Sequence, residues 1–128
     1  MRKAIAVALV GGMLLAAAPA SARIIVVDRD RAHGDYATAN AIGSVNDPKA
    51  VFVKVKSDPT DKRVRVIWNV TCSRPSGQSA TGGDFYRRTT VYEQLRMPFA
   101  NPDICRYSAT VQLTAGSARL TVVLLARV

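Results

Sequence analysis

The chain of 128 residues carries 18 Lys and Arg against nine Asp and Glu, a formal net charge of +9 at pH 7, and its length suits one domain. Its single histidine, single glutamate and two cysteines offer little for metal binding or for catalysis by paired carboxylates. The composition therefore argues against an enzyme, and we expect no cofactor and no metal.

Residues 1–22 have the pattern of an export signal. Arg2 and Lys3 supply a positive start, an uncharged run rich in Ala, Val and Leu follows, and Ala20-Ser21-Ala22 presents small residues before a cleavage point ahead of Arg23. The alternative is an uncleaved membrane anchor, but the run is shorter than the roughly 20 strongly apolar residues of a spanning helix. No cysteine for lipid attachment and no Arg-Arg pair accompany the run, which favours the general secretion route. We therefore expect a secreted, extracellular protein with no membrane span after cleavage.

Removal of 22 residues leaves a mature chain of 106 residues with 16 basic and nine acidic side chains, a net charge of +7. Such an excess favours anionic partners. The charges are dispersed, however, and Arg outnumbers Lys twelve to four, as a GC-rich genome produces without selection for polyanion binding. The charge therefore predicts no particular partner: an anionic cell-envelope polymer and an extracellular protein both stay open, and nucleic acid is not expected.

The first part of the mature chain, residues 23–46, fits several structures. Ile24 to Val27 fits an edge strand. Asp28 to Asp47 is polar and rich in small residues, so it fits a long loop, a short helical turn around Tyr36 to Asn40, or a flexible leader. We therefore divide the mature chain into an N-terminal strand, loop or leader at 23–46 and a packed domain at 47–128.

From residue 50 onward, apolar and polar residues alternate, which predicts strands with one buried face. In the first strand Val51, Val53 and Val55 point inward, and Ser57 to Asp61 has the composition of a turn. The clearest strand follows, with an inward series that contains the only tryptophan and a cysteine: Val64, Val66, Trp68, Val70 and Cys72.

The next segment, Ser73 to Asp84, is rich in Ser and Gly and contains Pro75, so it predicts a loop. A strand is expected from Thr89 to Met97. Pro98 and the sequence Asn101-Pro102-Asp103 end that strand, because proline cannot donate to a ladder.

The last two strands both alternate strictly. They run from Cys105 to Leu113 and from Ala118 to Ala126, and a short turn at Ala115-Gly116-Ser117 leads from one to the other. Two strands joined by so short a turn predict a hairpin. No window of useful length has a helical period.

Cys72 and Cys105 are expected to form a disulfide, because an exported chain with one pair of cysteines most simply joins them. Closing this loop should stabilise the fold by roughly 3–4 kcal/mol. Cys72 ends one strand and Cys105 begins another, so the two strands are antiparallel and meet at one end of the domain. A single strand between them would deliver Cys105 to the opposite end, so either 73–88 or 98–104 must cross the domain.

Crossing connections of this kind define a Greek-key sandwich. We therefore predict an all-β fold of the immunoglobulin-like or fibronectin-III-like type, with Trp68 in the core near the Cys72–Cys105 disulfide. The pattern is not that of a true immunoglobulin domain, because the tryptophan precedes the cysteine on the same strand.

Five segments in the C-terminal two-thirds of the chain carry a resemblance to known proteins: Val51-Phe52-Val53, Val64 to Cys72, Gly83-Asp84-Phe85, Asn101 to Cys105, and Arg119 to Val122. Together they resemble small secreted proteins of actinobacteria that carry an uncharacterised all-β domain. The resemblance implies structural motifs only, with no activity and no site residues.

Few residues are candidates for chemistry. His33 could serve a Ser-His-Asp hydrolase with the neighbouring Asp35, but no nucleophile-elbow sequence accompanies it. Asp28, Asp30 and Asp35 could supply oxygen ligands for calcium, but their spacing matches no EF-hand loop and the interposed arginines oppose cation binding. We therefore expect neither a catalytic site nor a metal site.

The most suggestive surface feature is Arg87-Arg88, which follows the predicted loop. With Arg74 and Arg106, expected at the same end of the domain, it forms a candidate binding surface for an anionic polymer. The disulfide-tethered loop at 73–88 could instead present an arginine to a trypsin-like protease. The simplest interpretation is a solvated pair before a strand. The sequence thus predicts a non-catalytic extracellular domain with a structural or binding role, and a secreted protease inhibitor is the second hypothesis.

Overall fold

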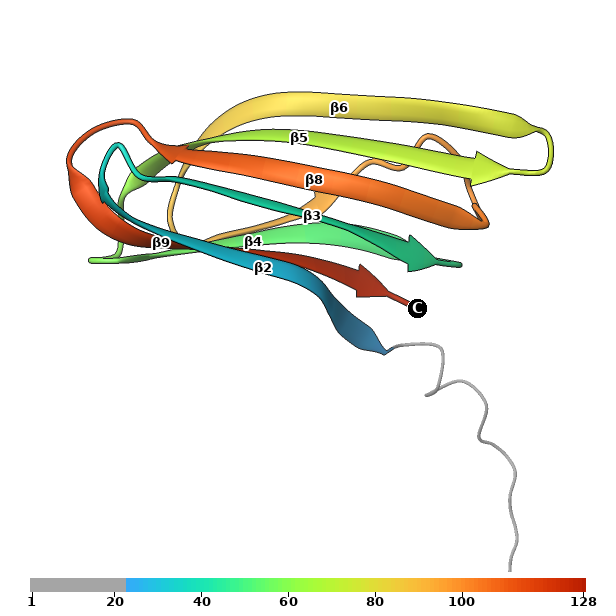
Figure 1. The fold of residues 1–128 in the computed structure, drawn as a ribbon, viewed down its shortest axis with the longest axis horizontal. Coiled ribbons are helices and arrows are strands. Elements are labelled where there is room, and N and C mark those ends of the chain that lie inside the picture. Colours follow the sequence, from blue (N-terminus) through green and yellow to red (C-terminus); the bar gives the residue numbers. More distant parts are fainter. Residues whose placement is uncertain (1–22) are drawn as a thin grey trace, which may run out of the picture.

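The computed structural model describes residues 23–128, and all regular elements in that range are β-strands (Figure 1). The export signal predicted at residues 1–22 lies outside the described part of the chain. The strands are β2 (Ile24–Asp35), β3 (Thr38–Asn46), β4 (Ala50–Asp58), β5 (Arg63–Arg74), β6 (Gly77–Arg88), β7 (Val91–Leu95), β8 (Ile104–Leu113) and β9 (Ser117–Arg127).

The strands form two antiparallel sheets of four. One sheet, here called the β9 sheet, has the order β2-β9-β4-β7, and the other, the β8 sheet, has the order β3-β8-β5-β6. Only the β5–β6 connection stays within one sheet, and the other six connections between the described strands cross from sheet to sheet. The predicted all-β sandwich with crossing connections is therefore confirmed.

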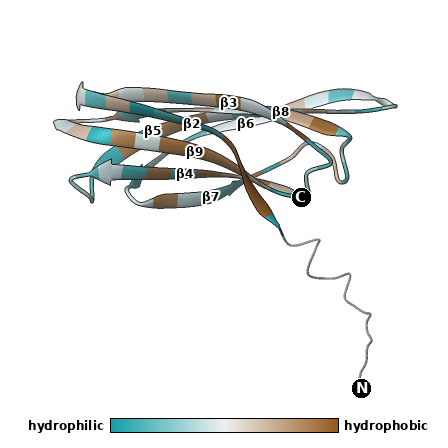
Figure 2. Ribbon diagram, turned by 60° about the horizontal axis from the view of Figure 1, so that its bottom comes forward, coloured by the Kyte–Doolittle hydropathy of each residue, from teal (hydrophilic) through white to brown (hydrophobic). Residues whose placement is uncertain are grey.

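Alternation decides which side chains form the core. The predicted inward series of β4, Val51, Val53 and Val55, is fully buried, and so is the series of β9 that ends in Leu124 and Ala126. Figure 2 shows the hydrophobic colouring concentrated on β4 and β9, the two central strands of their sheet. These residues face the inward series of the β8 sheet and form one core with it.

The predicted disulfide is present and joins neighbouring strands. Cys72 on β5 lies directly opposite Cys105 on β8, with 4.1 Å between their Cα atoms, and both residues are buried. Trp68, on the same face of β5, is only half-buried. Its ring lies against Gly83 of the neighbouring edge strand β6, and a Cβ atom at Gly83 would come within 2.6 Å of its indole nitrogen. Glycine at position 83 therefore makes room for this ring.

The segment predicted as a loop at 73–84 is mostly a strand. β6 pairs with β5 over twelve positions, from Arg74 opposite Gly77 to Arg63 opposite Arg88. Ser and Gly have a low intrinsic preference for strands, but a partner along the whole length overrides that preference. β6 is also the element that carries the chain across the domain, so one of the two predicted crossing segments is confirmed.

The hairpin predicted for the last two strands is wrong. β8 pairs with β3 and β5, whereas β9 pairs with β2 and β4, so the short turn after Leu113 joins the two sheets. A short connection serves a hairpin and a corner between sheets equally well. The alternation is the same in both cases, because each strand has one inward face.

Residues 24–46 are part of the sandwich, which therefore begins before residue 47. They form β2 and β3, and the inward residues Ala37, Ala39, Ala41 and Val45 belong to the core. Alanine alternating with polar residues is a weak hydrophobic pattern. The sequence alone therefore did not exclude a loop or a flexible leader for this segment. Gly43 is required here, because a Cβ atom at that position would lie 2.6 Å from the side chain of Val27.

Two aspartates close one long side of the sandwich. β3 ends its sheet, and its free backbone N–H groups at Asn40 and Ile42 donate to the carboxylates of Asp30 (2.8 Å) and Asp28 (2.9 Å) on β2. The carboxylates thus accept the hydrogen bonds that a further strand would accept, which protects an edge strand from pairing with another chain.

A buried tyrosine links the two sheets through the core. The hydroxyl of Tyr107 on β8 donates to the backbone carbonyl of Leu125 on β9 at 2.6 Å. Burial raises the pKa of the Tyr107 phenol above its usual range, because the phenolate would lose its hydration.

Replacing Asp30 by alanine should lower the free energy of unfolding by about 1 kcal/mol, because the Asn40 amide loses a charged acceptor. Denaturation with guanidinium chloride measures this change. Asp35→Ala is the matched control, since Asp35 lies on the same strand with an exposed side chain. Equal stability of the Asp30→Ala variant and the wild type would contradict the proposed role of the carboxylate.

Tyr107→Phe should cost about 1–2 kcal/mol, because the buried Leu125 carbonyl loses its donor. The wild type should also lose stability above about pH 10, since a raised folded-state pKa favours folding only while the phenol stays protonated. Thermal unfolding from pH 7 to 11 should show that the variant lacks this tyrosine-dependent loss. Tyr92→Phe, at an exposed position, is the control.

Candidate binding surface

The four arginines of the sequence-predicted surface do not lie together. Arg87 and Arg88 stand opposite Val64 and Arg63 at one end of β6, whereas Arg74 is at the other end, opposite Gly77. Arg106 lies near the Arg74 end. Eleven residues of strand separate the two ends, which corresponds to about 35 Å. The structure therefore splits the candidate surface into two distant pairs.

Three of these arginines have partners within the domain. Arg88 donates to the carboxylate and to the carbonyl of Asp61, each at 2.7 Å, and lowers the pKa of that carboxyl through this hydrogen bond. Arg87 pairs with Glu93 at 2.9 Å. Arg74 lies over the ring of Phe99, with 4.3 Å to the centroid. These contacts fold the guanidinium groups onto the domain instead of presenting them jointly to a ligand.

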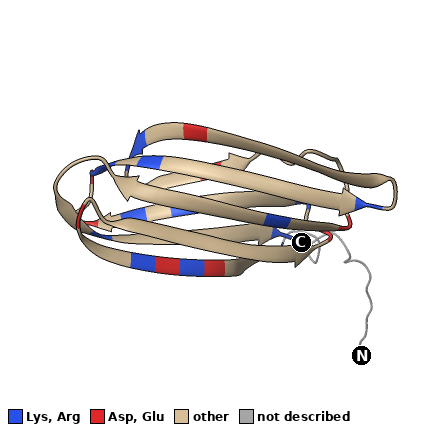
Figure 3. Cartoon of the chain, turned by 45° about the horizontal axis from the view of Figure 1, so that its top comes forward, with Lys and Arg blue, Asp and Glu red and all other residues tan. Residues whose placement is uncertain are grey.

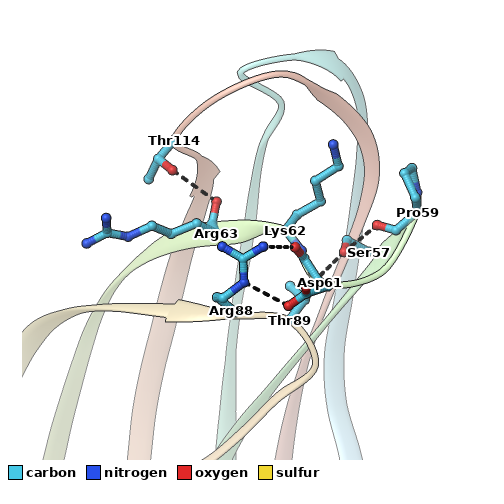
Figure 4. A network of polar contacts seen from close by, with 8 residues as sticks. All are labelled: Ser57, Pro59, Asp61, Lys62, Arg63, Arg88, Thr89 and Thr114. Carbon is cyan, nitrogen blue, oxygen red and sulfur yellow. Dashed lines mark hydrogen bonds and ion pairs between the residues drawn. The ribbon is translucent and has the colours of Figure 1, made fainter.

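A cluster of polar groups lies beside the Arg88–Asp61 pair (Figure 4). The buried hydroxyls of Ser57 and Thr89 hydrogen-bond to each other, and the Thr89 hydroxyl also accepts from the Lys62 N–H at 2.9 Å. Ser57 donates to the Pro59 carbonyl at 2.8 Å. The hydroxyls are therefore occupied in tying the β4–β5 connection to the residues before β7.

His33 lines the same hollow as Ser57 and Asp58, but these side chains form no hydrogen-bonded triad among the described residues, because the Ser57 hydroxyl is engaged by the Pro59 carbonyl and by Thr89. The histidine is exposed on the outer face of β2, opposite Arg119 of β9. Within residues 23–128 its side chain makes no hydrogen bond to a serine or an aspartate, and no three His, Cys, Asp or Glu side chains are grouped to hold a metal ion. The carboxylates of Asp28 and Asp30, considered for calcium, are engaged by the amides of β3.

A different set of basic residues gathers on the outer face of the β9 sheet. The register places residues of β2, β9 and β4 directly opposite one another, and each such row of three is called a rung here. Two neighbouring rungs have a basic residue on both outer strands and a short residue in the middle: Arg29–Val123–Lys54 and Arg31–Thr121–Lys56.

These rungs form a groove of about 420 Å³ that runs along β9. Its floor consists of Thr121, Val123 and Leu125, and we call it the β9 groove. Arg29 and Arg31 form one wall, and Lys54 and Lys56 form the other. The outward-facing Val123 and Leu125 are almost fully buried. The aliphatic stems of long basic side chains are suited to covering apolar residues in this way, with their charges left in water.

The charge of the β9 groove is uncompensated over both basic rungs. The ion pairs found among the described residues are Arg65–Asp84, Arg87–Glu93 and Arg88–Asp61, and none of them involves the groove. Acidic and basic residues alternate along β2, as the colours in Figure 3 show. The two aspartates bond to β3, and the two arginines between and after them therefore point to the outer face. A carboxylate is present only at the end of the groove, where Asp58 lies opposite Arg119.

One end of the groove is apolar and the other is basic. The rung Val26–Leu125–Phe52 closes the apolar end. Tyr92 on β7 stands opposite Lys54 of the neighbouring basic rung, with its ring 5.6 Å from that of Phe52. Val26 and Tyr92 are 53% and 54% exposed. At the opposite end a second hollow of about 580 Å³ continues past Thr121 to His33 and Arg119.

The outer face of the β8 sheet has a different character. Its central rows carry neutral hydrogen-bonding side chains, such as Asn40 and Thr110, which bond to each other at 2.7 Å. Of the arginines on this face, Arg65 pairs with Asp84 at 2.6 Å, whereas Arg63 and Arg106 belong to no ion pair found among the described residues. The two outer faces therefore differ in the arrangement of their basic residues: the face formed by β2, β9 and β4 carries them on both sides of two neighbouring rungs.

Sequence reasoning did not identify this groove. The alternation correctly placed Lys54 and Lys56 on the outer side of their strand and showed Arg29 and Arg31 two residues apart. The strand order β2-β9-β4, however, brings together segments separated by up to about a hundred residues. A local sequence pattern cannot predict such neighbours.

No protein-family model matches this chain, and no curated protein matches it. A solved structure from a study of carbohydrate-binding modules of the β-sandwich superfamily is similar, with a TM-score of 0.35 and 8% sequence identity. The match covers 80% of this chain and 52% of that one, so the chain spans about half the length of its neighbour. This likeness is too distant to assign a ligand, and the resemblance to secreted actinobacterial proteins remains a prediction.

Nothing in the described range forms a helix long and apolar enough to cross a membrane.

Thr89→Val keeps the size of the side chain but removes the hydroxyl that joins Ser57 to the Lys62 amide. We expect a loss of about 1–3 kcal/mol in the free energy of unfolding, because a buried donor and a buried hydroxyl lose their partner. Chemical denaturation provides the measurement. Thr90→Val, next to it but exposed, should have little effect, and equal effects at both positions would exclude the role assigned to Thr89.

Proposed function

We propose that this protein is a secreted, non-catalytic binding domain that attaches to an anionic cell-envelope polymer through the β9 groove. The observation that supports this function most directly is the pair of basic rungs without a carboxylate. Four positive side chains on two rungs form a continuous site for a negatively charged chain.

The arrangement is preorganised. The walls stand on strands that are hydrogen-bonded to β9 on both sides, so the four Cα positions are fixed before a ligand arrives. Only side-chain rotamers must be ordered on binding, which limits the entropic cost. The net charge of +7 calculated for the mature chain adds a long-range attraction for polyanions.

The state of the polar side chains supports a non-catalytic role. The hydroxyls of Ser57 and Thr89 are committed to structural hydrogen bonds, and both cysteines are joined in the disulfide. His33 lies on an exposed strand face opposite a second basic residue, Arg119, and the one serine that lines the same hollow, Ser57, has its hydroxyl engaged by Thr89 and the Pro59 carbonyl. Nothing in this arrangement favours acid–base or nucleophilic chemistry.

The second hypothesis, a protease inhibitor, assumed a long exposed loop at 73–88. The segment 73–88 forms the end of β5, a turn of two residues and β6, and it is not a long exposed loop. Arg87 and Arg88 are held by Glu93 and Asp61. No observation in the structure favours inhibition, so we do not develop it.

Two variants with equal loss of charge separate the groove from the surface predicted from the sequence. The groove variant replaces Arg29, Arg31, Lys54 and Lys56 by glutamine, and the control variant replaces Arg74, Arg87, Arg88 and Arg106 in the same way. Binding to dextran sulfate, with uncharged dextran as the blank, is measured by isothermal titration at 50 and 200 mM salt. The wild type should bind more weakly at the higher salt concentration, because binding releases counterions.

The groove variant should lose at least roughly tenfold in affinity, and the control variant should lose much less. An equal loss in both variants would show that only net charge matters, which contradicts the proposal. A loss confined to the control variant would instead restore the surface predicted from the sequence.

A further inference from the structure

The β9 groove has a repeat along its length. Arg29 and Arg31 are two residues apart on β2, and Lys54 and Lys56 are two residues apart on β4, so the charged rungs follow one another at about 6.7 Å. Across the groove the two walls are separated by two strand spacings, about 9.5 Å. A ligand that uses both rungs therefore needs anionic groups at a matching interval along one linear chain.

Each rung presents positive charge from two opposite sides. An anionic group over Val123 lies between Arg29 and Lys54, and one over Thr121 lies between Arg31 and Lys56. A phosphodiester within a chain suits this geometry, because its two non-bridging oxygens project to opposite sides of the chain axis. One oxygen can accept from the arginine wall and the other from the lysine wall. A carboxylate is attached at the side of a polymer chain and turns both oxygens toward the same side.

The interval between the rungs also fits a particular linker. A step of two residues along a strand contains six backbone bonds, since each residue contributes three. A chain in which glycerol units are joined by phosphodiesters likewise has six backbone bonds from one phosphorus to the next. When both chains are extended, successive phosphates come at nearly the same interval as successive rungs.

On these grounds we propose that the β9 groove binds an extended glycerol-phosphate polymer, with consecutive phosphates over Val123 and Thr121. The proposal rests on the function proposed above and adds the chemical class of the ligand. The rung Val26–Leu125–Phe52 carries no charge, so the row of phosphate-binding positions, which we call the phosphate register, ends there. Arg119 extends it at the other side, where Asp58 weakens the attraction.

The floor of the groove favours this polymer over a single-stranded nucleic acid, whose backbone has the same number of bonds between phosphates. Binding of a single strand relies on aromatic side chains on which the bases stack. Thr121, Val123 and Leu125 offer no aromatic face. Tyr92 stands opposite Lys54 but behind the lysine wall, tilted against Phe52 and outside the groove lining. Short aliphatic units fit this floor, since they need only van der Waals contact.

Synthetic glycerol-phosphate oligomers with one to six phosphates test the proposal. Their affinity for the mature protein is measured by isothermal titration at one fixed low salt concentration. Affinity should rise steeply up to about three phosphates and then level off, because the register covers two full rungs and Arg119. An affinity that keeps rising in proportion to length would overturn the register.

Three comparison ligands of six charges identify the chemistry: hexaglutamate, a hexagalacturonate and an oligothymidylate. The glycerol-phosphate hexamer should bind about tenfold more tightly than either carboxylate polymer. Equal affinities for all of them would leave the proposed function standing and refute the phosphodiester preference. Tighter binding of oligothymidylate would refute the choice of polymer, and binding of none of the polyanions would refute both proposals.

Single-rung variants test the placement of the phosphates. Arg29→Gln with Lys54→Gln empties one rung, and Arg31→Gln with Lys56→Gln empties the next. Each should abolish the gain in affinity between one and two phosphates, while Arg74→Gln with Arg106→Gln, which removes the same charge elsewhere, should preserve it. Far-ultraviolet circular dichroism checks that each variant is folded. A gain that persists in both rung variants would contradict the placement.

Discussion

The hydrogen bonds from the β3 amides to Asp28 and Asp30 join the two sheets along one side and fix which side chains of β2 lie on the outer face. They join the free edges of the two sheets at β2 and β3. Because side chains on a strand alternate, turning the aspartates toward β3 turns Arg29 and Arg31 to the outer face. One strand therefore protects an edge with its acidic residues and builds a groove wall with its basic residues.

The crossing connections complete the groove. They place β9, the last strand, between β2 and β4, so the floor comes from the C-terminal segment and the walls come from the first half of the chain. Val123 and Thr121 are shorter than the arginines and lysines beside them, and this difference in length creates the groove on an otherwise flat sheet. The walls would not face each other if β8 and β9 formed a hairpin within one sheet.

Stability and binding depend on different parts of the molecule. The disulfide, the Tyr107 hydroxyl and the Ser57–Thr89 cluster tie β-strands together from the inside or at the corners, and none of them uses a basic side chain of the β9 groove. The exposed ion pairs of Arg65, Arg87 and Arg88 lie at the β6 side, where such pairs contribute little to stability but remove free charge. The four basic residues of the β9 groove belong to none of these ion pairs, and the strand register fixes their spacing.

By itself the sequence determined the all-β class, the Cys72–Cys105 disulfide and the inward face of most strands, because alternation and cysteine pairing can be read locally. Only the tertiary structure decided that 73–84 contributes a strand, that β8 and β9 belong to different sheets, and that Arg29 and Arg31 face Lys54 and Lys56. The physical reason is that alternation fixes which way a side chain points, whereas a neighbour in a sheet is a non-local choice. The packing of the whole core determines which strands become neighbours, and the groove depends on that strand order.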